Sequence, residues 1–147
     1  MKTLLVYRIE KVLLQDNGYY KSKGILNVYQ GLNLELLKTF KDTPPNKSYK
    51  AVSGGGSTNG TLPIGLYKIS LVTALADTKN NVPYKGEGFP WFARLDALGN
   101  CTRTGLAIHP DGNLPGTAGC LGVLENDIEL YENLKSVYVD GIELIVV

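Results

Sequence analysis

Apolar and polar residues alternate over several short stretches of this chain, which is the period-two pattern of half-buried β-strands. The runs Leu32 to Phe40 and Leu66 to Leu75 both show this pattern over part of their length. An apolar run from Leu4 to Ile9 is followed by the turn-forming residues Asp16 to Gly18. We therefore expect the chain to open with a hairpin and to be built mostly of strands.

Further strand-like runs recur along the chain, divided by residues that favour turns. The turns fall at Gln30-Gly31, in the proline-containing loop Asp42 to Ser48, and in the polar segment Asp77 to Asn81. The additional predicted strands are Ile25 to Tyr29, Tyr49 to Val52, Trp91 to Leu95, Thr104 to Ile108 and Ile142 to Val147.

One segment near the C-terminus has helical rather than strand periodicity. Asn126 is followed three residues later by Glu129, which is the spacing of a capping box, and Ile128, Tyr131 and Leu134 share one face. We predict a helix from about Asn126 to Ser136. The residues after it, Val137 to Val147 with Asp140-Gly141 between two apolar runs, predict a hairpin with a type I′ turn.

Composition supports one globular, β-rich domain of 147 residues. Gly 17 and Pro 7 are a high share, 44% of residues are hydrophobic and 20% are charged. A formal net charge of +1 offers no bulk attraction to nucleic acid or to an anionic membrane, so neither is an expected partner. The glycine run at Gly54 to Gly56 lacks a following Gly-Lys-Ser/Thr and precedes a strand, which disfavours a phosphate loop.

The N-terminal apolar run ends at Arg8 and Glu10, too early for the apolar core of a signal peptide, which needs about 7–15 residues. Apolar stretches also fall short of the roughly 20 residues of a membrane span. We expect synthesis in the cytoplasm without a signal peptide.

The most informative chemistry is the pairing of the chain's one histidine, His109, with Cys120. A thiol with a pKa near about 8.5 is mostly protonated at neutral pH, and an imidazole activates it by accepting its proton. Gly119 before the cysteine suits a tight turn whose backbone N–H groups bind a developing oxyanion. Cys101 stands in a polar stretch without an adjacent base, so we expect it to be structural.

A metal site is not expected, because His109, Cys120, Cys101 and Asp111 have no ligand-spacing motif. We predict no cofactor. The competing interpretation of His109 and Cys120 is that both are incidental: a cysteine in a glycine-rich turn is often a small buried hydrophobe.

The residues Thr61 to Tyr67, Ile108-His109 and Thr117 to Cys120, in this order, resemble the motifs of the L,D-transpeptidase (YkuD-type) catalytic domain. The resemblance covers roughly Gly24 to Val147. Among members of that family, the short His-to-Cys loop is most similar to antibacterial type VI secretion effectors. The chain departs from the family pattern at Ala118 and Gly122, where members carry a polar residue and an arginine.

The resemblance implies a mostly β fold: a sandwich or partly closed barrel of mixed sheets, with one helix beside the cysteine turn. It implies one domain over 1–147, with an extra N-terminal hairpin over 1–24 and a catalytic core over 25–147. It also implies a cell-wall site of action reached by delivery, with a secretion apparatus and an immunity protein as partners.

The implied activity is acyl transfer on peptidoglycan stem peptides. Cys120 attacks the carbonyl after the third residue of the stem tetrapeptide, releases terminal D-alanine and forms a thioester, while His109 acts as base and then acid. An amine acceptor gives L,D-transpeptidation and water gives L,D-carboxypeptidation. The sequence leaves both outcomes open.

Supporting residues complete the predicted site. Thr117 helps to form the turn or contacts the histidine, and Arg103 or Arg94 supplies the cation for the substrate carboxylate. Trp91 or Phe92 forms an apolar wall near the histidine, and Asp111 contacts substrate or caps a turn.

Two other functions compete with this interpretation. The first is another type of cysteine peptidase or amidase, but papain-like and related wall peptidases place the cysteine before the histidine, the reverse of the order in this chain. The second alternative is a non-catalytic β-domain that binds cell-wall fragments or a protein partner through aromatic residues.

Overall fold

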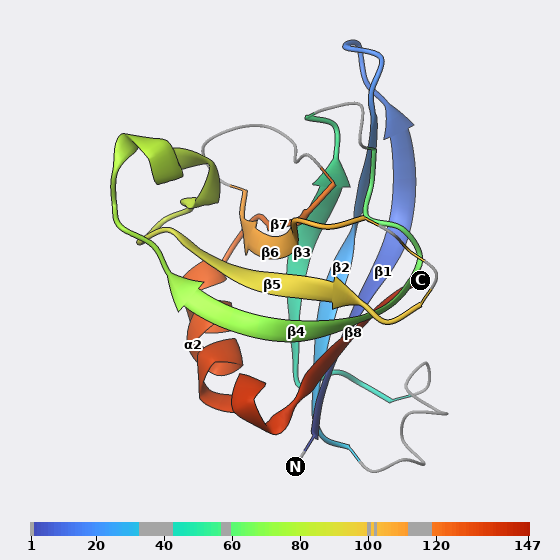
Figure 1. Ribbon diagram of the computed structural model, residues 1–147. Helices are drawn as coiled ribbons and strands as arrows, with labels where there is room; N and C mark the ends of the chain where they lie inside the picture. The colour runs from blue at the N-terminus through green and yellow to red at the C-terminus, as the bar shows by residue number, and fades with distance from the viewer. Residues whose placement is uncertain (1, 33–42, 57–59, 100, 102, 112–118) are drawn as a thin grey trace.

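The computed structural model of the chain describes residues 2–32, 43–56, 60–99, 101, 103–111 and 119–147 (Figure 1). Strands make up most of this structure, with short helical segments on the outside. The strands are β1 (Lys2–Leu14), β2 (Tyr20–Leu32), β3 (Lys47–Gly54), β4 (Gly65–Ala74), β5 (Trp91–Ala97), β6 (Leu106–Pro110), β7 (Leu121–Val123) and β8 (Ile142–Val146). The helical segments are the 3-10 helices η2 (Lys79–Tyr84) and η3 (Tyr138–Asp140) and the α-helix α2 (Asp127–Val137).

The strands close into a barrel in the order β1-β2-β3-β7-β6-β5-β4-β8. The pairs β6–β7 and β1–β8 are parallel and the other neighbours are antiparallel. The expectation of a mostly β fold with mixed strand directions and a helix is confirmed, and the barrel is closed rather than partly open. Closure leaves no unpaired sheet edge between β8 and β1.

The core fills the barrel interior, because inward and outward side chains alternate along each strand. In β8, Ile142, Leu144 and Val146 are fully buried while the residues between them are half-buried. The largest buried side chains include Trp91 and the tyrosines of β1, β3 and β4. Residues at outward positions of the strands are therefore the ones available for chemistry.

The predicted N-terminal hairpin is present as β1 and β2, but it is an integral part of the barrel. β1 pairs with both β2 and β8, and the boundary drawn at residue 24 falls inside β2. An added Cβ at Gly24 would overlap the carbonyl oxygen of Arg8, so glycine permits the close approach of the two strands. The prediction of a turn at Gln30-Gly31 is wrong, because β2 continues through these residues to Leu32.

The other predicted strands can be compared with the observed ones. The prediction for Leu66 to Leu75 corresponds to β4, and the predictions for residues 49–52, 91–95, 104–108 and 142–147 correspond to β3, β5, β6 and β8. After Leu32, the remainder of the strand predicted over Leu32 to Phe40 lies outside the described residues.

The α-helix has the predicted extent, but its start differs from the capping box. Asn126 is in the left-handed region at φ 52° and makes no side-chain cap hydrogen bond. The Glu129 carboxylate instead accepts a hydrogen bond from Tyr49 at 2.9 Å and lies 3.4 Å from the Lys47 ammonium. Glu129 therefore ties the helix to β3. The helix follows the cysteine turn through β7 and contacts β4 and β5.

The C-terminal hairpin prediction is wrong. The chain leaves α2 through the 3-10 turn Tyr138–Asp140, and Gly141 at φ 94° then reverses it into β8. Val137 and Tyr138 pack on the core beside the helix, so their apolar character reflects tertiary packing rather than a strand. The expectation of a final buried strand is confirmed, because β8 lies between β1 and β4.

Candidate functional site

The two residues expected to do chemistry lie on the outer face of the barrel, on neighbouring strands. Leu121 of β7 pairs with Ile108 of β6, and both side chains are buried in the core. By the alternation of a strand, His109 and Cys120 then share the opposite face. His109 pairs with Gly122, so Cys120 is its diagonal neighbour across the two strands.

The imidazole of His109 is set up to accept a proton. Its Nδ1 lies 2.7 Å from the carbonyl oxygen of Pro110, which can only accept a hydrogen bond. The proton of the neutral ring therefore sits on Nδ1, and Nε2 carries the basic lone pair. Burial lowers the pKa of His109 below its ordinary value of 6.5, and the bond to Pro110 opposes this effect. The ring is neutral at neutral pH.

The thiol of Cys120 is also held in its neutral form. Burial raises its pKa, and a backbone hydrogen bond from Ala107 and the positive charge of Arg103 partly offset this rise. Its Sγ lies 3.7 Å from the carbonyl oxygen of Gly105. For such a neutral thiol to act as a nucleophile, a general base such as a neutral imidazole would have to take its proton as it attacks.

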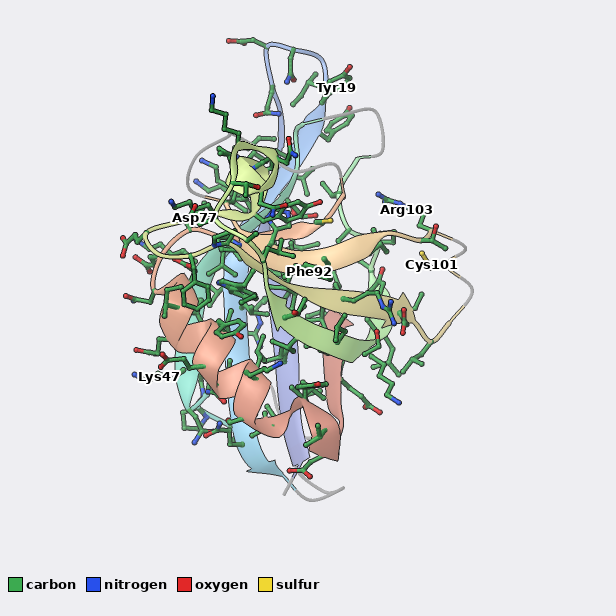
Figure 2. The ribbon with its side chains drawn as sticks, turned by 60° about the vertical axis from the view of Figure 1, so that its left-hand side comes forward. Tyr19, Lys47, Asp77, Phe92, Cys101 and Arg103 are labelled. Atoms are coloured by element: carbon green, nitrogen blue, oxygen red, sulfur yellow. The ribbon has the colours of Figure 1, made fainter. Side chains whose placement is uncertain are left out.

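Cys120 opens into a pocket of about 300 Å³ on this outer face. Its walls are largely apolar, with an amide and a guanidinium among them, as is typical of small-molecule sites. The lining residues are Leu75, Asn81, Tyr84, Phe92, Arg94, Gly105, Leu106, Ala107 and Cys120. Of the two aromatic residues that the sequence left as alternatives, Trp91 and Phe92, it is Phe92 that lines this pocket (labelled in Figure 2).

Tyr84 was not anticipated from the sequence and connects the pocket to the histidine. Its ring stands edge-on to the imidazole of His109, with the ring centroids 5.2 Å apart and the planes at 76°. The same ring packs near Phe92 at 6.3 Å. Tyr84 thus covers one side of the imidazole while it lines the pocket of the thiol.

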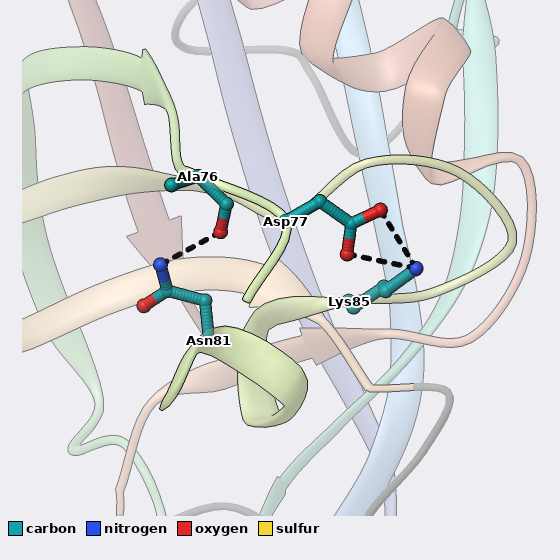
Figure 3. A network of polar contacts seen from close by, with 4 residues as sticks. All are labelled: Ala76, Asp77, Asn81 and Lys85. Atoms are coloured by element: carbon teal, nitrogen blue, oxygen red, sulfur yellow. Dashed lines mark hydrogen bonds and ion pairs between the residues drawn. The ribbon is translucent and has the colours of Figure 1, made fainter. Parts of the chain in front are cut away.

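The β4–β5 connection that carries Tyr84 is shaped by polar contacts within itself (Figure 3). The side-chain amide of Asn81 donates to the carbonyl oxygen of Ala76 at 2.9 Å. The Lys85 ammonium contacts both carboxylate oxygens of Asp77, at 2.9 and 3.0 Å. These contacts bracket η2, so they hold Asn81 and Tyr84 at the pocket.

A second pocket of about 380 Å³ adjoins the first and shares Arg94 and Gly105 with it. Arg103, Cys101 and Asp96 also line it, and Figure 2 shows Arg103 and Cys101 near each other. The two arginines predicted to bind a carboxylate are therefore brought to one groove. Arg94 donates to Ser70 at 2.9 Å, and its Nε lies 3.9 Å from Asp96.

The structure removes Trp91 from the predicted site. Its side chain is fully buried in the barrel core, and its indole N–H donates to Asp127 at 3.2 Å. Trp91 and Phe92 are consecutive in β5, so they point to opposite faces. Because Trp91 points into the barrel, it cannot line the pocket; its hydrogen bond to Asp127 instead ties the start of α2 to β5.

The remaining predicted residues are placed as follows. Gly119 is buried at φ 100°, consistent with a tight turn before the cysteine. Asp111 follows β6, is half-buried, and its backbone N–H bonds the carbonyl of Val123. Thr117 lies outside the described residues. Cys101 is a free cysteine. Burial, and to a lesser degree the interaction with Cys101, raise the pKa of the Tyr67 phenol to about 12.

Ser53 is a second residue that the sequence did not single out. Its side chain is fully buried, and its hydroxyl donates to the carbonyl oxygen of Cys120 at 2.7 Å. The hydroxyl oxygen of Ser53 in turn accepts a hydrogen bond from the backbone N–H of Leu62, also at 2.7 Å. One hydroxyl therefore joins β3, the β3–β4 connection and the cysteine turn. The only sign of this role in the sequence is a serine that directly follows the predicted strand, at a position that faces the interior.

The described part of the chain contains no group of three or more His, Cys, Asp and Glu side chains arranged to hold a metal ion. Among its helices, none has the length and apolar character to cross a membrane. Comparison with known proteins finds no family model and no curated sequence that matches the chain.

Proposed function

We propose that this protein is a cysteine-dependent acyl-transfer enzyme of the L,D-transpeptidase or L,D-carboxypeptidase type, acting on peptidoglycan stem peptides. The observation that carries the proposal is the shared face of Cys120 and His109, with the thiol at the wall of a pocket and the imidazole N–H fixed on Pro110. This arrangement has the nucleophile and the oriented base that thiol acyl transfer requires. The motif resemblance supplies the substrate class.

In the proposed reaction, Nε2 of His109 accepts the Cys120 proton as Sγ forms a bond to the peptide carbonyl. The resulting oxyanion is stabilised by backbone N–H groups at the Gly119 turn. The intermediate collapses, the C–N bond breaks, and the imidazolium returns its proton to the departing D-alanine amine. A thioester remains on Cys120. Water or an amine then attacks it, with His109 again as base, and the thiol is restored.

The groove next to the thiol supports a peptide substrate that carries carboxylates. Arg94 reaches both pockets, Arg103 lines the second, and Phe92 offers an apolar wall in the first. A stem peptide combines acidic groups with short aliphatic side chains, so both kinds of contact have a counterpart. The proposed site of action is the cell wall after delivery.

The direct test is to incubate the protein with a purified stem tetrapeptide, with and without an amine acceptor, and to measure the product masses. We expect D-alanine release, with a tripeptide product in water or an acceptor conjugate in its presence. Cys120→Ala abolishes release in this account, and Cys101→Ser is the matched control that retains it. Fragment binding without turnover in the wild type would support the non-catalytic binding domain instead.

A further inference from the structure

A single arginine lies between the cysteine turn and two other segments of the chain. Arg103 follows β5 and precedes β6, and its Nη1 donates to the carbonyl oxygen of Thr61 at 2.9 Å. Its Nη2 occupies the place where a Cβ on Gly119 would be. The guanidinium is thus fixed at one end by the β3–β4 connection and lies at the other against the residue before Cys120.

Gly119 is needed for two independent reasons at this contact. Its φ of 100° is a conformation that residues with a Cβ rarely adopt, and the guanidinium fills the space a side chain would take. The close approach brings a permanent positive charge beside the thiol, because arginine stays protonated at all ordinary pH values.

We propose that Arg103 is a positioning residue for Cys120: its guanidinium holds the cysteine turn against Thr61 and places a fixed positive charge where the thiolate develops. This inference deepens the proposed function, since it takes Cys120 as the nucleophile. It gives Arg103 a role at the thiol in addition to lining the groove, and it leaves Arg94 as the cation for substrate.

The charge environment of the thiol in the described structure agrees with this role. The groups around it are His109 from β6, Arg94 from β5, Tyr84 from η2 and Arg103. His109 is neutral, and Arg94 is engaged with Ser70 and near Asp96. The positive charge of Arg103 acts to lower the pKa of the thiol. It acts in the same direction on the Tyr67 phenol, whose pKa burial and the interaction with Cys101 raise.

The test is the pH profile of alkylation at each cysteine, measured by pulsed iodoacetamide labelling and peptide mass analysis of the full chain. Arg103→Met removes the charge, Arg103→Lys keeps it without the planar fork, and Arg94→Met is the matched control. Because labelling needs no stem peptide, the result is independent of the substrate. Cys101 is read out in the same samples as an internal reference.

We expect Arg103→Met to slow labelling of Cys120 about three- to tenfold at neutral pH and to move its profile to higher pH. Arg103→Lys should recover much of this loss, and Arg94→Met should leave the profile in place. The proposal is overturned if Arg103→Met keeps the wild-type profile, if Arg103→Lys moves it as far as Arg103→Met, or if Arg94→Met has the same effect. A circular dichroism spectrum of each variant checks that it is folded, and for an unfolded methionine variant Arg103→Gln provides the neutral comparison.

Discussion

The buried hydroxyl of Ser53 joins the cysteine turn to the neighbouring connection, and Ser53→Ala removes both of its hydrogen bonds. The deletion leaves the Leu62 N–H buried without its acceptor, at a cost of about 1–3 kcal/mol, and loses a hydrogen bond to Cys120 with a net contribution of about 0.5–1.5 kcal/mol. We therefore expect the free energy of unfolding to fall by about 1.5–4.5 kcal/mol. Because the lost partner is the carbonyl of Cys120, labelling of that thiol should also change.

The assay is equilibrium urea unfolding followed by fluorescence of the chain's one tryptophan. Ser48→Ala on the same strand is the matched control: its hydroxyl donates to Asn27 at 2.7 Å, but Ser48 is exposed, so we expect a change of about 1 kcal/mol or less. If the urea midpoint of Ser53→Ala lies as close to that of the wild type as the midpoint of Ser48→Ala does, with an unchanged m-value, then the two hydrogen bonds of Ser53 do not contribute the expected stability.

Three further predictions follow from the site. Trp91→Phe should lower the free energy of unfolding by about 1–3 kcal/mol, because it loses the hydrogen bond to Asp127, and should leave KM for stem peptide unchanged. Phe92→Ala should raise KM with little change in the free energy of unfolding. Urea unfolding and steady-state kinetics separate the two effects. His109→Ala should reduce turnover nearly as much as Cys120→Ala, and the double variant should be scarcely worse; additive losses would show that the pair does not act as a unit. With increasing pH, kcat/KM should rise through the pKa of His109, which lies below 6.5, because the base must be neutral. It should fall only above pH 9.0, through the raised pKa of Cys120, because the proton for the leaving amine is then lost. A narrow optimum between pH 6.5 and 9.0 would contradict the assignment.

Strand periodicity predicted the β-rich fold because inward and outward positions of a barrel alternate, as in β4 and β8. It could not separate a strand from a helix end at Val137 and Tyr138, since either element can pack such apolar residues against the core. The closing of the barrel through the β1–β8 pair was also beyond reach, because it joins segments from opposite ends of the chain. Strand pairing at such separation has no local sequence signal.

His109 and Cys120 could be singled out from the sequence as a candidate pair because such residues are rare: the chain has one histidine and two cysteines. What the sequence could not show is which face each aromatic residue takes, so it left Trp91 and Phe92 as alternatives for the wall of the site. Arg103 was expected to contact substrate, whereas its contacts with Thr61 and Gly119 depend on three segments meeting in space. Tyr84 and Ser53 were missed for the same reason.

Covalent catalysis by Cys120 can be tested by the intact mass of the protein after brief mixing with stem tetrapeptide, followed by acid quenching and peptide mapping. We expect an added mass equal to the acyl-tripeptide, located on Cys120 and absent from Cys120→Ala. Release of D-alanine at the wild-type rate by Cys120→Ala, or an adduct confined to Cys101, would contradict it.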